Sequence, residues 1–448
     1  MKPSKRLPAA FSILLIAVLL VACAGQQATP TVTPAPPAPS TAPPPTEAAP
    51  DTSAPAEPQA RQGLRPDAPE YAKRGPFPVG YQSLVMGEGS DRPLEAGLWY
   101  PALNPKGAKE EITYPIKLKI PLDPIDAPVV AYGRALQDAE VDTSAGPYPL
   151  VIFSHGFGTN AVWSNTLLEH YASHGFIVLA PEHIEQFDPE YSDVWKASID
   201  RPLDIKRTLD YAEQINAADG DMAGLIDMQH VAVVGHSTGG YTALAMAGAQ
   251  YDLAAFNARC AQLPPDDPHT FLCAPLVPKE ADMAARAGLD PMPEGLWPSL
   301  GDPRVTAIIP TAGDSYLFDK AGLAKITIPM MAIGGTADTG TPYEWGSKPS
   351  YDNASSAKKA LVTLEGAEHT ITASCKNMPW INETPFGPWI CFDPVWDKDR
   401  GLDLIHHFST AFLLDTLKGD EAAAKALAPE NVTFPGIKYE SAGYGAAP

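Results

Sequence analysis

The sequence predicts an α/β domain built on a mostly parallel, doubly wound sheet. Short apolar, β-branched runs alternate with longer stretches of good helix formers through most of the chain. This alternation is typical of units in which a helix crosses over a parallel sheet between two strands. About 380 residues remain once the N-terminal segment is set aside, which is long enough for one large domain with a well-buried sheet.

The expected elements follow from these runs in chain order. We expect strands near residues 79–87, 96–101, 148–154, 176–181, 230–234, 304–310, 326–333 and 360–364. We expect helices near residues 162–173, 196–215, 238–250, 352–358 and 399–418. Residues 251–303 are rich in proline and fall between a helix and the next strand, so we expect a cap or lid insertion that shapes a pocket.

A Gly-x-Ser-x-Gly frame places Ser237 between Gly235 and Gly239. The frame follows an apolar, β-branched run at residues 230–234 and precedes good helix formers at residues 241–248. Such a tight turn between a strand and a helix leaves the serine hydroxyl exposed above the sheet. A side chain at either glycine would collide with the neighbouring strand or helix. We therefore predict that Ser237 is a catalytic nucleophile and not part of a merely structural turn.

A candidate acid and a candidate base follow Ser237 in the order that this elbow requires. A serine nucleophile needs a base to remove its proton and an acid to orient that base. Asp338 lies in a Gly/Thr loop after a buried strand, and His369 follows the next, shorter strand. Asp314 follows the preceding strand and is the rival acid. We predict that Ser237, Asp338 and His369 are catalytic, with Asp314 as the alternative acid.

A loop that can bind an oxyanion follows the strand at residues 148–154. That strand ends in the run His-Gly-Phe-Gly, which begins at His155. Backbone N–H groups at such a strand end, with the one after the nucleophile, stabilise the negative oxygen of an acyl-transfer transition state. We predict that the N–H groups of Phe157 and Thr238 form this oxyanion hole and that His155 is structural.

With these motifs, the chain resembles the α/β-hydrolase superfamily. Within it, the chain is most similar to the platelet-activating-factor acetylhydrolase and dienelactone-hydrolase-like branch, with bacterial cutinase-like polyester hydrolases nearby. The likeness covers roughly residues 75–420 and implies the α/β-hydrolase fold and carboxylic ester hydrolysis without a cofactor. It is carried by residues 92–101, 149–183 and 235–240, with Asp338 and His369.

The resemblance leaves two positions for the acid. In the acetylhydrolases the acid is expected after the sixth strand, which here is followed by Asp314. The loop around Asp338, Gly-Gly-Thr-Ala-Asp-Thr-Gly-Thr-Pro, is more similar to the bacterial esterase pattern. We therefore prefer Asp338.

The N-terminus has the pattern of a bacterial lipoprotein signal. Basic residues precede an apolar run at residues 11–21, and Leu-Val-Ala-Cys closes it at Cys23. The apolar run is shorter than the ~20 residues of a spanning helix. We expect residues 1–22 to be a signal peptide and Cys23 to be diacylated, which anchors the protein stably to a membrane.

A Pro/Ala/Thr-rich segment separates this anchor from the domain. Residues 23–65 contain almost no large apolar side chains, so they cannot bury enough surface to offset their ordering entropy. We expect a disordered tether here and the hydrolase domain at residues 66–448. The expected location is the bacterial cell envelope, outside the cytoplasm.

Excluding Cys23, the four cysteines are even in number, which in an exported domain favours disulfides. Sequence alone leaves three connectivities, and proximity favours two short loops. Neither pair has zinc-site spacing, so we expect no metal. The favoured pairs are Cys260–Cys273 and Cys375–Cys391.

A cluster of aromatic residues lies at positions 380–392. Two interpretations remain open: the cluster lines a substrate groove, or it forms a small hydrophobic core held by a disulfide. Its members are Trp380, Phe386, Trp389 and Phe392.

The formal charge of −21 argues against binding to nucleic acid or directly to anionic lipid. We expect a monomeric serine carboxylesterase that acts on short-acyl esters, an acetylated phospholipid or a polyester. Two alternatives are a non-catalytic surface binding lipoprotein on the same scaffold and a serine peptidase with the same triad.

Overall fold

The computed structural model describes residues 62–444 except 120–121, 123–124, 126, 186–190 and 268. The expectations for the signal peptide, for Cys23 and for most of the tether therefore lie outside the described residues. Leu64 and Arg65 donate backbone hydrogen bonds to the carboxylate of Asp403, so these two residues are attached to the domain.

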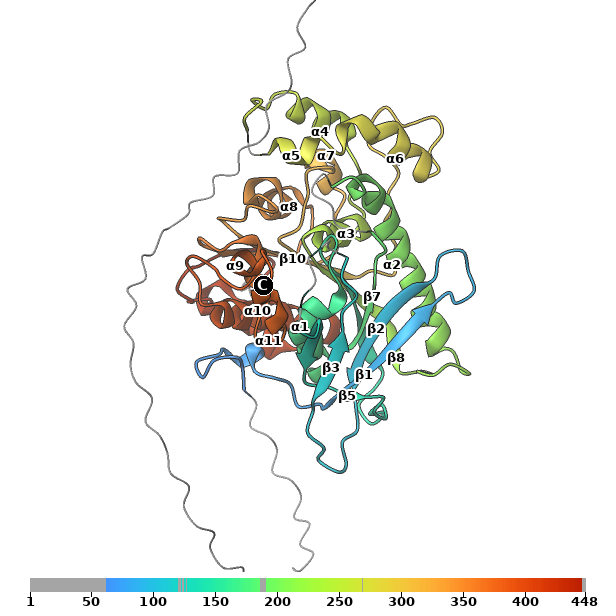
Figure 1. The fold of residues 1–448 in the computed structure, drawn as a ribbon, viewed down its shortest axis with the longest axis vertical. Coiled ribbons are helices and arrows are strands. Elements are labelled where there is room, and N and C mark those ends of the chain that lie inside the picture. The colour runs from blue at the N-terminus through green and yellow to red at the C-terminus, as the bar shows by residue number, and fades with distance from the viewer. Residues whose placement is uncertain are drawn as a thin grey trace, which may run out of the picture. The chain divides into compact units, whose positions relative to one another are not determined.

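A ten-stranded mixed sheet runs through the centre of the domain (Figure 1). The strands from β7 to β11 are parallel. At one edge β12 is antiparallel to β11, and near the other edge β2 is antiparallel to both β7 and β1, whereas β1 pairs in parallel with β5. The order across the sheet is β12 (Ile437–Ala442), β11 (Lys359–Leu364), β10 (Met330–Gly335), β9 (Ala307–Thr311), β8 (Ile226–His236), β6 (Tyr148–Ser154), β7 (Ile177–Pro181), β2 (Leu94–Pro101), β1 (Val79–Met86) and β5 (Leu136–Gln137). The expected α/β fold with a large, mostly parallel sheet is confirmed.

The remaining elements are helices and one short hairpin, β3 (Ile112–Pro115) with β4 (Val130–Gly133). The α-helices are α1 (Asn165–Ser173), α2 (Val194–Asn216), α3 (Thr238–Met246), α4 (Leu253–Cys260), α5 (Thr270–Cys273), α6 (Glu280–Arg286), α7 (Asp319–Leu323), α8 (Ser347–Asn353), α9 (Gly387–Ile390), α10 (Lys398–Lys418) and α11 (Glu421–Ala426). Short 3₁₀ helices lie at Glu70–Ala72, Ala161–Ser164, Val277–Lys279, Tyr343–Trp345, His369–Thr372, Pro379–Glu383 and Pro429–Asn431.

Helices cover both faces of the sheet, and β6 shows how the sequence produces this arrangement. Every residue of β6 is buried. Leu150 and Ile152 pack into the core shared with α2 and α3, whereas Val151 and Phe153 pack into the core shared with α1 and α10. Because side chains alternate along a strand, a continuously apolar run is what a strand covered on both faces requires.

Several expected elements have shifted bounds, among them one helix and one strand that contain or follow a proline. The helix expected at residues 352–358 is α8, Ser347–Asn353, and residues 354–358 are not helical. Pro349 lies in the first turn of α8, where a helix does not need its N–H. The strand expected at residues 326–333 begins only at Met330, because Pro329 has no N–H to contribute to a ladder.

The structure contains several short elements that the sequence did not predict. The strands β3, β4, β5 and β12 and the short helices α4–α7, α9 and α11 have weak or brief sequence signals. Among the described residues, the structure contains no helix with the length and hydropathy of a membrane span.

Two disulfides join the four cysteines of the domain as expected. Cys260 and Cys273 connect α4 to α5 with a Cα–Cα distance of 5.8 Å. Cys375 and Cys391 close the segment after β11 with a Cα–Cα distance of 5.3 Å. Residues 251–303 carry α4, α5 and α6, which gather with α7 at the top of Figure 1.

Candidate active site

Ser237 lies in the turn between β8 and α3 with a strained backbone. Its φ and ψ angles are 57° and −124°, a region that side-chain-bearing residues rarely adopt. A β-carbon at Gly239 would lie 1.8 Å from the Ser154 carbonyl oxygen, and one at Gly235 would lie 2.2 Å from the Gly239 carbonyl oxygen. The two glycines therefore permit the close approach of strand and helix that holds this turn.

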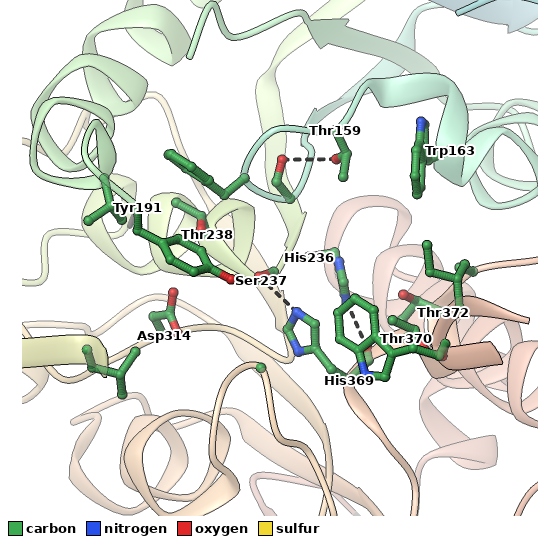
Figure 2. Close-up of a pocket in the computed structure, with 18 of the residues that line it drawn as sticks. Thr159, Trp163, Tyr191, His236, Ser237, Thr238, Asp314, His369, Thr370 and Thr372 are labelled. Atoms are coloured by element: carbon green, nitrogen blue, oxygen red, sulfur yellow. Dashed lines mark hydrogen bonds between the residues drawn. The ribbon is translucent and has the colours of Figure 1, made fainter. Parts of the chain in front are cut away.

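His369 lies between Ser237 and Asp338. Its Nε2 is 3.0 Å from the Ser237 Oγ, and its Nδ1 is 2.9 Å from a carboxylate oxygen of Asp338 (Figure 2 shows the bond to Ser237). Asp338 follows β10 and His369 follows β11, so the parallel sheet brings both loops to the edge where β8 ends. The geometry matches that of a nucleophile, a base and an orienting acid.

The Asp338 carboxylate is itself held in place by its loop. Its Oδ1 accepts backbone hydrogen bonds from Gly340, at 2.9 Å, and from Thr341, at 2.6 Å. Both carboxylate oxygens lie 2.9 Å from the His369 Nδ1. Because both oxygens are engaged, the carboxylate keeps its orientation toward Nδ1.

Asp338 also determines the charge preference of His369. Burial by itself lowers the pKa of this imidazole, but the neighbouring carboxylate of Asp338 raises it. Asp314 and Glu368 add to the increase, and the pKa of His369 lies above its ordinary value. The site thus favours the imidazolium that forms when the base accepts a proton.

Asp314, the rival acid, lines the pocket and makes no hydrogen bond to His369 among those found in the described residues. Only 7% of its surface is exposed, and its Oδ1 has no hydrogen-bond partner within the described part of the chain. Burial raises the pKa of Asp314 to about 7. In Figure 2 Asp314 and Tyr191 lie to the left of Ser237, whereas His369 lies below it and to the right.

Two further side chains lie beside His369: Trp389 belongs to the aromatic cluster at residues 380–392, whereas a role for His236 was not expected from the sequence. The Nε2 of His236 donates a hydrogen bond to the His369 carbonyl oxygen at 3.1 Å, and burial lowers the pKa of His236 to about 3. The Trp389 ring lies nearly parallel to the His369 ring, with centroids 6.1 Å apart. In the sequence, His236 stands out only because it occupies the variable position before Ser237 in the Gly-x-Ser-x-Gly frame.

The predicted oxyanion loop lies against the nucleophile. A β-carbon at Gly156 would be 3.7 Å from the Ser237 β-carbon. Among the described residues, neither the Phe157 N–H nor the Thr238 N–H donates a hydrogen bond to another protein atom. Thr238 is the first residue of α3, where the N–H has no partner inside the helix. Both groups therefore remain available to an oxygen bound beside Ser237.

A largely apolar pocket surrounds Ser237 and His369. Residues of the 251–303 segment form one wall, and the 375–391 disulfide loop contributes another. The first wall consists of Phe271, Leu272, Pro275 and Leu276, and the second of Phe386, Trp389 and Ile390.

The aromatic cluster divides between the two interpretations that the sequence left open. Trp380 is 1% exposed and donates its indole N–H to the Val130 carbonyl, so it belongs to a core. Trp389 is 42% exposed and lines the pocket. Phe392 is 74% exposed, and Phe386 lines the pocket while packing against the core.

A second Ser–His–Asp arrangement lies beneath the oxyanion loop. The His183 Nε2 is 2.9 Å from the Ser154 Oγ, and its Nδ1 is 3.0 Å from the Asp204 Oδ2. All three residues are fully buried, and none lines the pocket of Ser237. This arrangement therefore connects the end of β6 to α2 and has no access to a substrate.

Within the described residues, no group of three or more histidine, cysteine or acidic side chains is arranged to hold a metal ion.

The elbow, the loop after β6 and the Ser–His–Asp contacts together have the geometry of a serine hydrolase site on an α/β sheet. Residues 139–261, which carry β6, the elbow and α3, match the family model described as chlorophyllase, a lipase/esterase-like α/β-hydrolase family. The matched residues include Ser237 but neither Asp338 nor His369. The match implies the α/β-hydrolase fold that the sequence predicts.

Curated chlorophyllases show the same likeness over a limited length. The chain is 30% identical to chlorophyllase-1 of Arabidopsis thaliana over 129 residues, which are 29% of this chain and 37% of that protein. It is 30% identical to the chloroplastic chlorophyllase-1 of Citrus unshiu and of Citrus sinensis over 101 residues, or 22% of this chain and 29% of each relative. The chain thus spans about a third of the length of the curated relatives it matches.

Proposed function

We propose that this protein is a serine carboxylic ester hydrolase that works through an acyl-enzyme. The observation that carries the proposal is the continuous contact from Asp338 through His369 to Ser237, at 2.9 and 3.0 Å, inside an apolar pocket. The likeness to chlorophyllases supports an esterase-type activity. This likeness does not support the finer assignment to the acetylhydrolase and cutinase-like branch, so that assignment remains a proposal.

In the first half of the reaction, the Ser237 Oγ attacks the ester carbonyl carbon while the His369 Nε2 takes the hydroxyl proton. The carbonyl oxygen becomes negative and accepts hydrogen bonds from the N–H groups of Phe157 and Thr238. When the carbonyl re-forms, the bond to the alcohol oxygen breaks. The imidazolium returns its proton to that oxygen, and the alcohol leaves. The acyl group is now on Ser237.

In the second half, a water molecule attacks the acyl carbon and His369 takes one of its protons. The ester bond to Ser237 breaks, and the serine recovers its proton from the imidazolium. Asp338 remains ionised throughout and holds His369 in the tautomer whose Nε2 faces the serine. The products are a carboxylic acid and an alcohol, and no cofactor takes part in these steps.

The walls of the pocket favour an apolar acyl or alcohol group. We propose that residues 251–303 act as a cap, because Phe271 and Leu272 on that segment contact the same cavity as Ser237. Short-acyl esters, an acetylated phospholipid and a polyester are the substrate classes that such a pocket accepts.

A series of nitrophenyl esters of increasing acyl length tests the function. We expect saturable hydrolysis with an optimum in kcat/KM, because burial of each methylene group contributes about 0.8 kcal/mol until the pocket is full. Turnover no faster than the buffer rate for every ester, together with a fluorophosphonate that leaves Ser237 unlabelled, would contradict an esterase and favour a binding protein.

The pH dependence of kcat/KM reports the pKa of His369 in the free enzyme. The base must be neutral to accept the serine proton, so activity is lost as the pH falls through its pKa. Because that pKa is raised, we expect the midpoint above 6.5. Asp338→Asn removes the carboxylate that raises the pKa and should move the midpoint of the residual activity to lower pH. The kcat/KM of Asp314→Asn should still be lost as the pH falls. That result would exclude the Asp314 carboxyl as the group whose titration causes the loss.

We also propose that the mature protein begins at a lipidated Cys23 and is anchored to a membrane of the bacterial cell envelope. The motif Leu-Val-Ala-Cys carries this proposal. Mass spectrometry of the exported protein should find a diacylated Cys23 at the N-terminus, and Cys23→Ser should release the protein from the membrane fraction. An unmodified Cys23 in the exported protein, or a mature start elsewhere, contradicts it.

A further inference from the structure

Arg201 lies directly behind the oxyanion loop. It belongs to α2, and its side chain is fully buried. One guanidinium nitrogen, Nη1, donates to the carbonyl oxygen of His155. The other, Nη2, donates to the carbonyl oxygen of Gly156 at 3.2 Å and to the carboxylate of Glu185. The guanidinium thus contacts two consecutive carbonyl groups of the loop.

The Gly156 carbonyl oxygen receives further donors from the loop itself. The Nδ1 of His155 is 2.8 Å from it, the Thr159 hydroxyl donates to it at 2.9 Å (a bond drawn in Figure 2), and the Thr159 N–H donates at 3.3 Å. Because the His183 N–H donates to the His155 Nε2, the proton of this neutral imidazole is on Nδ1 and can be donated. Burial lowers the pKa of His155 well below its ordinary value.

These donors act on the peptide unit that carries the candidate oxyanion donor. The Gly156 C=O and the Phe157 N–H belong to one planar trans peptide, so they point in opposite directions. Hydrogen bonds that fix the Gly156 carbonyl oxygen therefore also fix the direction of the Phe157 N–H. Donors on the oxygen also polarise the same peptide, which strengthens its N–H as a donor in a site of low dielectric.

We propose that Arg201, held by Glu185, is a positioning residue that fixes the Phe157 N–H for the oxyanion. The inference rests on the proposed esterase function and deepens it. Arg201 does not line the pocket of Ser237, so it acts through the Gly156–Phe157 peptide.

The shape of the guanidinium explains why arginine occupies this position. Two carbonyl oxygens and one carboxylate surround it, and its planar, forked donors reach all three. Glu185 supplies the countercharge that a buried cation requires, and its side chain is 8% exposed. Although burial raises the pKa of Glu185, the charge of Arg201 lowers it below the ordinary value. A lysine would keep the positive charge but would lack the planar set of donors that reaches all three acceptors.

The test compares a nitrophenyl ester with the corresponding thionoester. Sulfur accepts hydrogen bonds weakly, so hydrolysis of a C=S substrate depends less on the oxyanion hole. In Arg201→Lys and Arg201→Met we expect kcat for the ester to fall by about 10²- to 10³-fold, the cost of one lost oxyanion donor. KM should change little, and the preference for ester over thionoester should fall by a similar factor.

Two further variants separate positioning from stability. Thr208→Val, on the same helix, removes a buried hydroxyl whose one hydrogen bond within the described residues goes to the Asp204 carbonyl of its own helix. It should lower the melting temperature and leave the ester preference unchanged. Thr159→Val removes one donor to the Gly156 carbonyl and should lower the preference by a smaller factor than Arg201→Lys.

Some results would overturn the proposal. If folded Arg201→Lys and Thr159→Val keep the wild-type kcat and ester preference below their melting temperatures, Arg201 is only a structural residue. Should Arg201→Met fail to fold, these two variants still decide the question. A wild-type protein that hydrolyses neither substrate would refute the esterase function itself, which is a different outcome from an active protein with an unaltered preference.

Discussion

Replacement of Ser237 by alanine is expected to lower kcat for a nitrophenyl ester on the order of 10⁶-fold, as is typical when a serine nucleophile is removed. The acyl-enzyme can no longer form, so fluorophosphonate labelling should disappear as well. Residual turnover above the buffer rate would come from the oxyanion hole and from substrate binding alone.

Ser154→Ala is the matched control, because Ser154 also contacts a histidine that contacts an aspartate. Ser154 is fully buried and does not line the pocket, so its alanine variant should remain labelled on Ser237. Loss of a buried partner for His183 should instead lower stability by about 1–3 kcal/mol.

Near wild-type turnover by purified Ser237→Ala would refute the mechanism.

The second large effect is expected for Asp338→Asn. An asparagine can donate a hydrogen bond to Nδ1, which favours the tautomer whose Nε2 carries the proton and cannot accept the serine hydroxyl proton. We expect kcat to fall by about 10⁴-fold while the fold is retained. Kinetics and a melting curve on the same sample measure both quantities.

Asp314→Asn provides the contrast, because it changes the rival carboxyl, which lines the pocket of Ser237 and His369. Its carboxyl makes no hydrogen bond to His369 within the described residues, so kcat should fall far less than in Asp338→Asn. If the two losses were reversed, Asp314 would be the acid, and the serine esterase function would still hold.

Much of the fold and part of the site could be predicted because their signals are local. A strand buried on both faces needs a continuous apolar run, and β6 has one at residues 149–153. The turn at Ser237 needs glycines on either side, since β-carbons there would overlap backbone atoms. The short disulfides Cys260–Cys273 and Cys375–Cys391 follow from proximity along the chain.

The short elements could not be predicted because their stability depends on tertiary contacts. β12 pairs with β11 at the sheet edge, and its residues are only partly buried, so its sequence carries little periodic signal. Likewise, α4, α5 and α6 have eight, four and seven residues, too few to be stable as isolated helices.

The class of sheet, the elbow around Ser237 and the order of the candidate residues could all be read from the sequence, because each depends on local backbone geometry or on side-chain periodicity. The contact of Asp338, and not Asp314, with His369 depends on the folded arrangement, since both loops open at the same edge of the sheet and their reach depends on packing. The folded arrangement also brings Arg201 to the Gly156 carbonyl across 45 residues of chain. Contacts between residues so far apart depend on how the helices pack on the sheet, and no local pattern in the sequence records that packing.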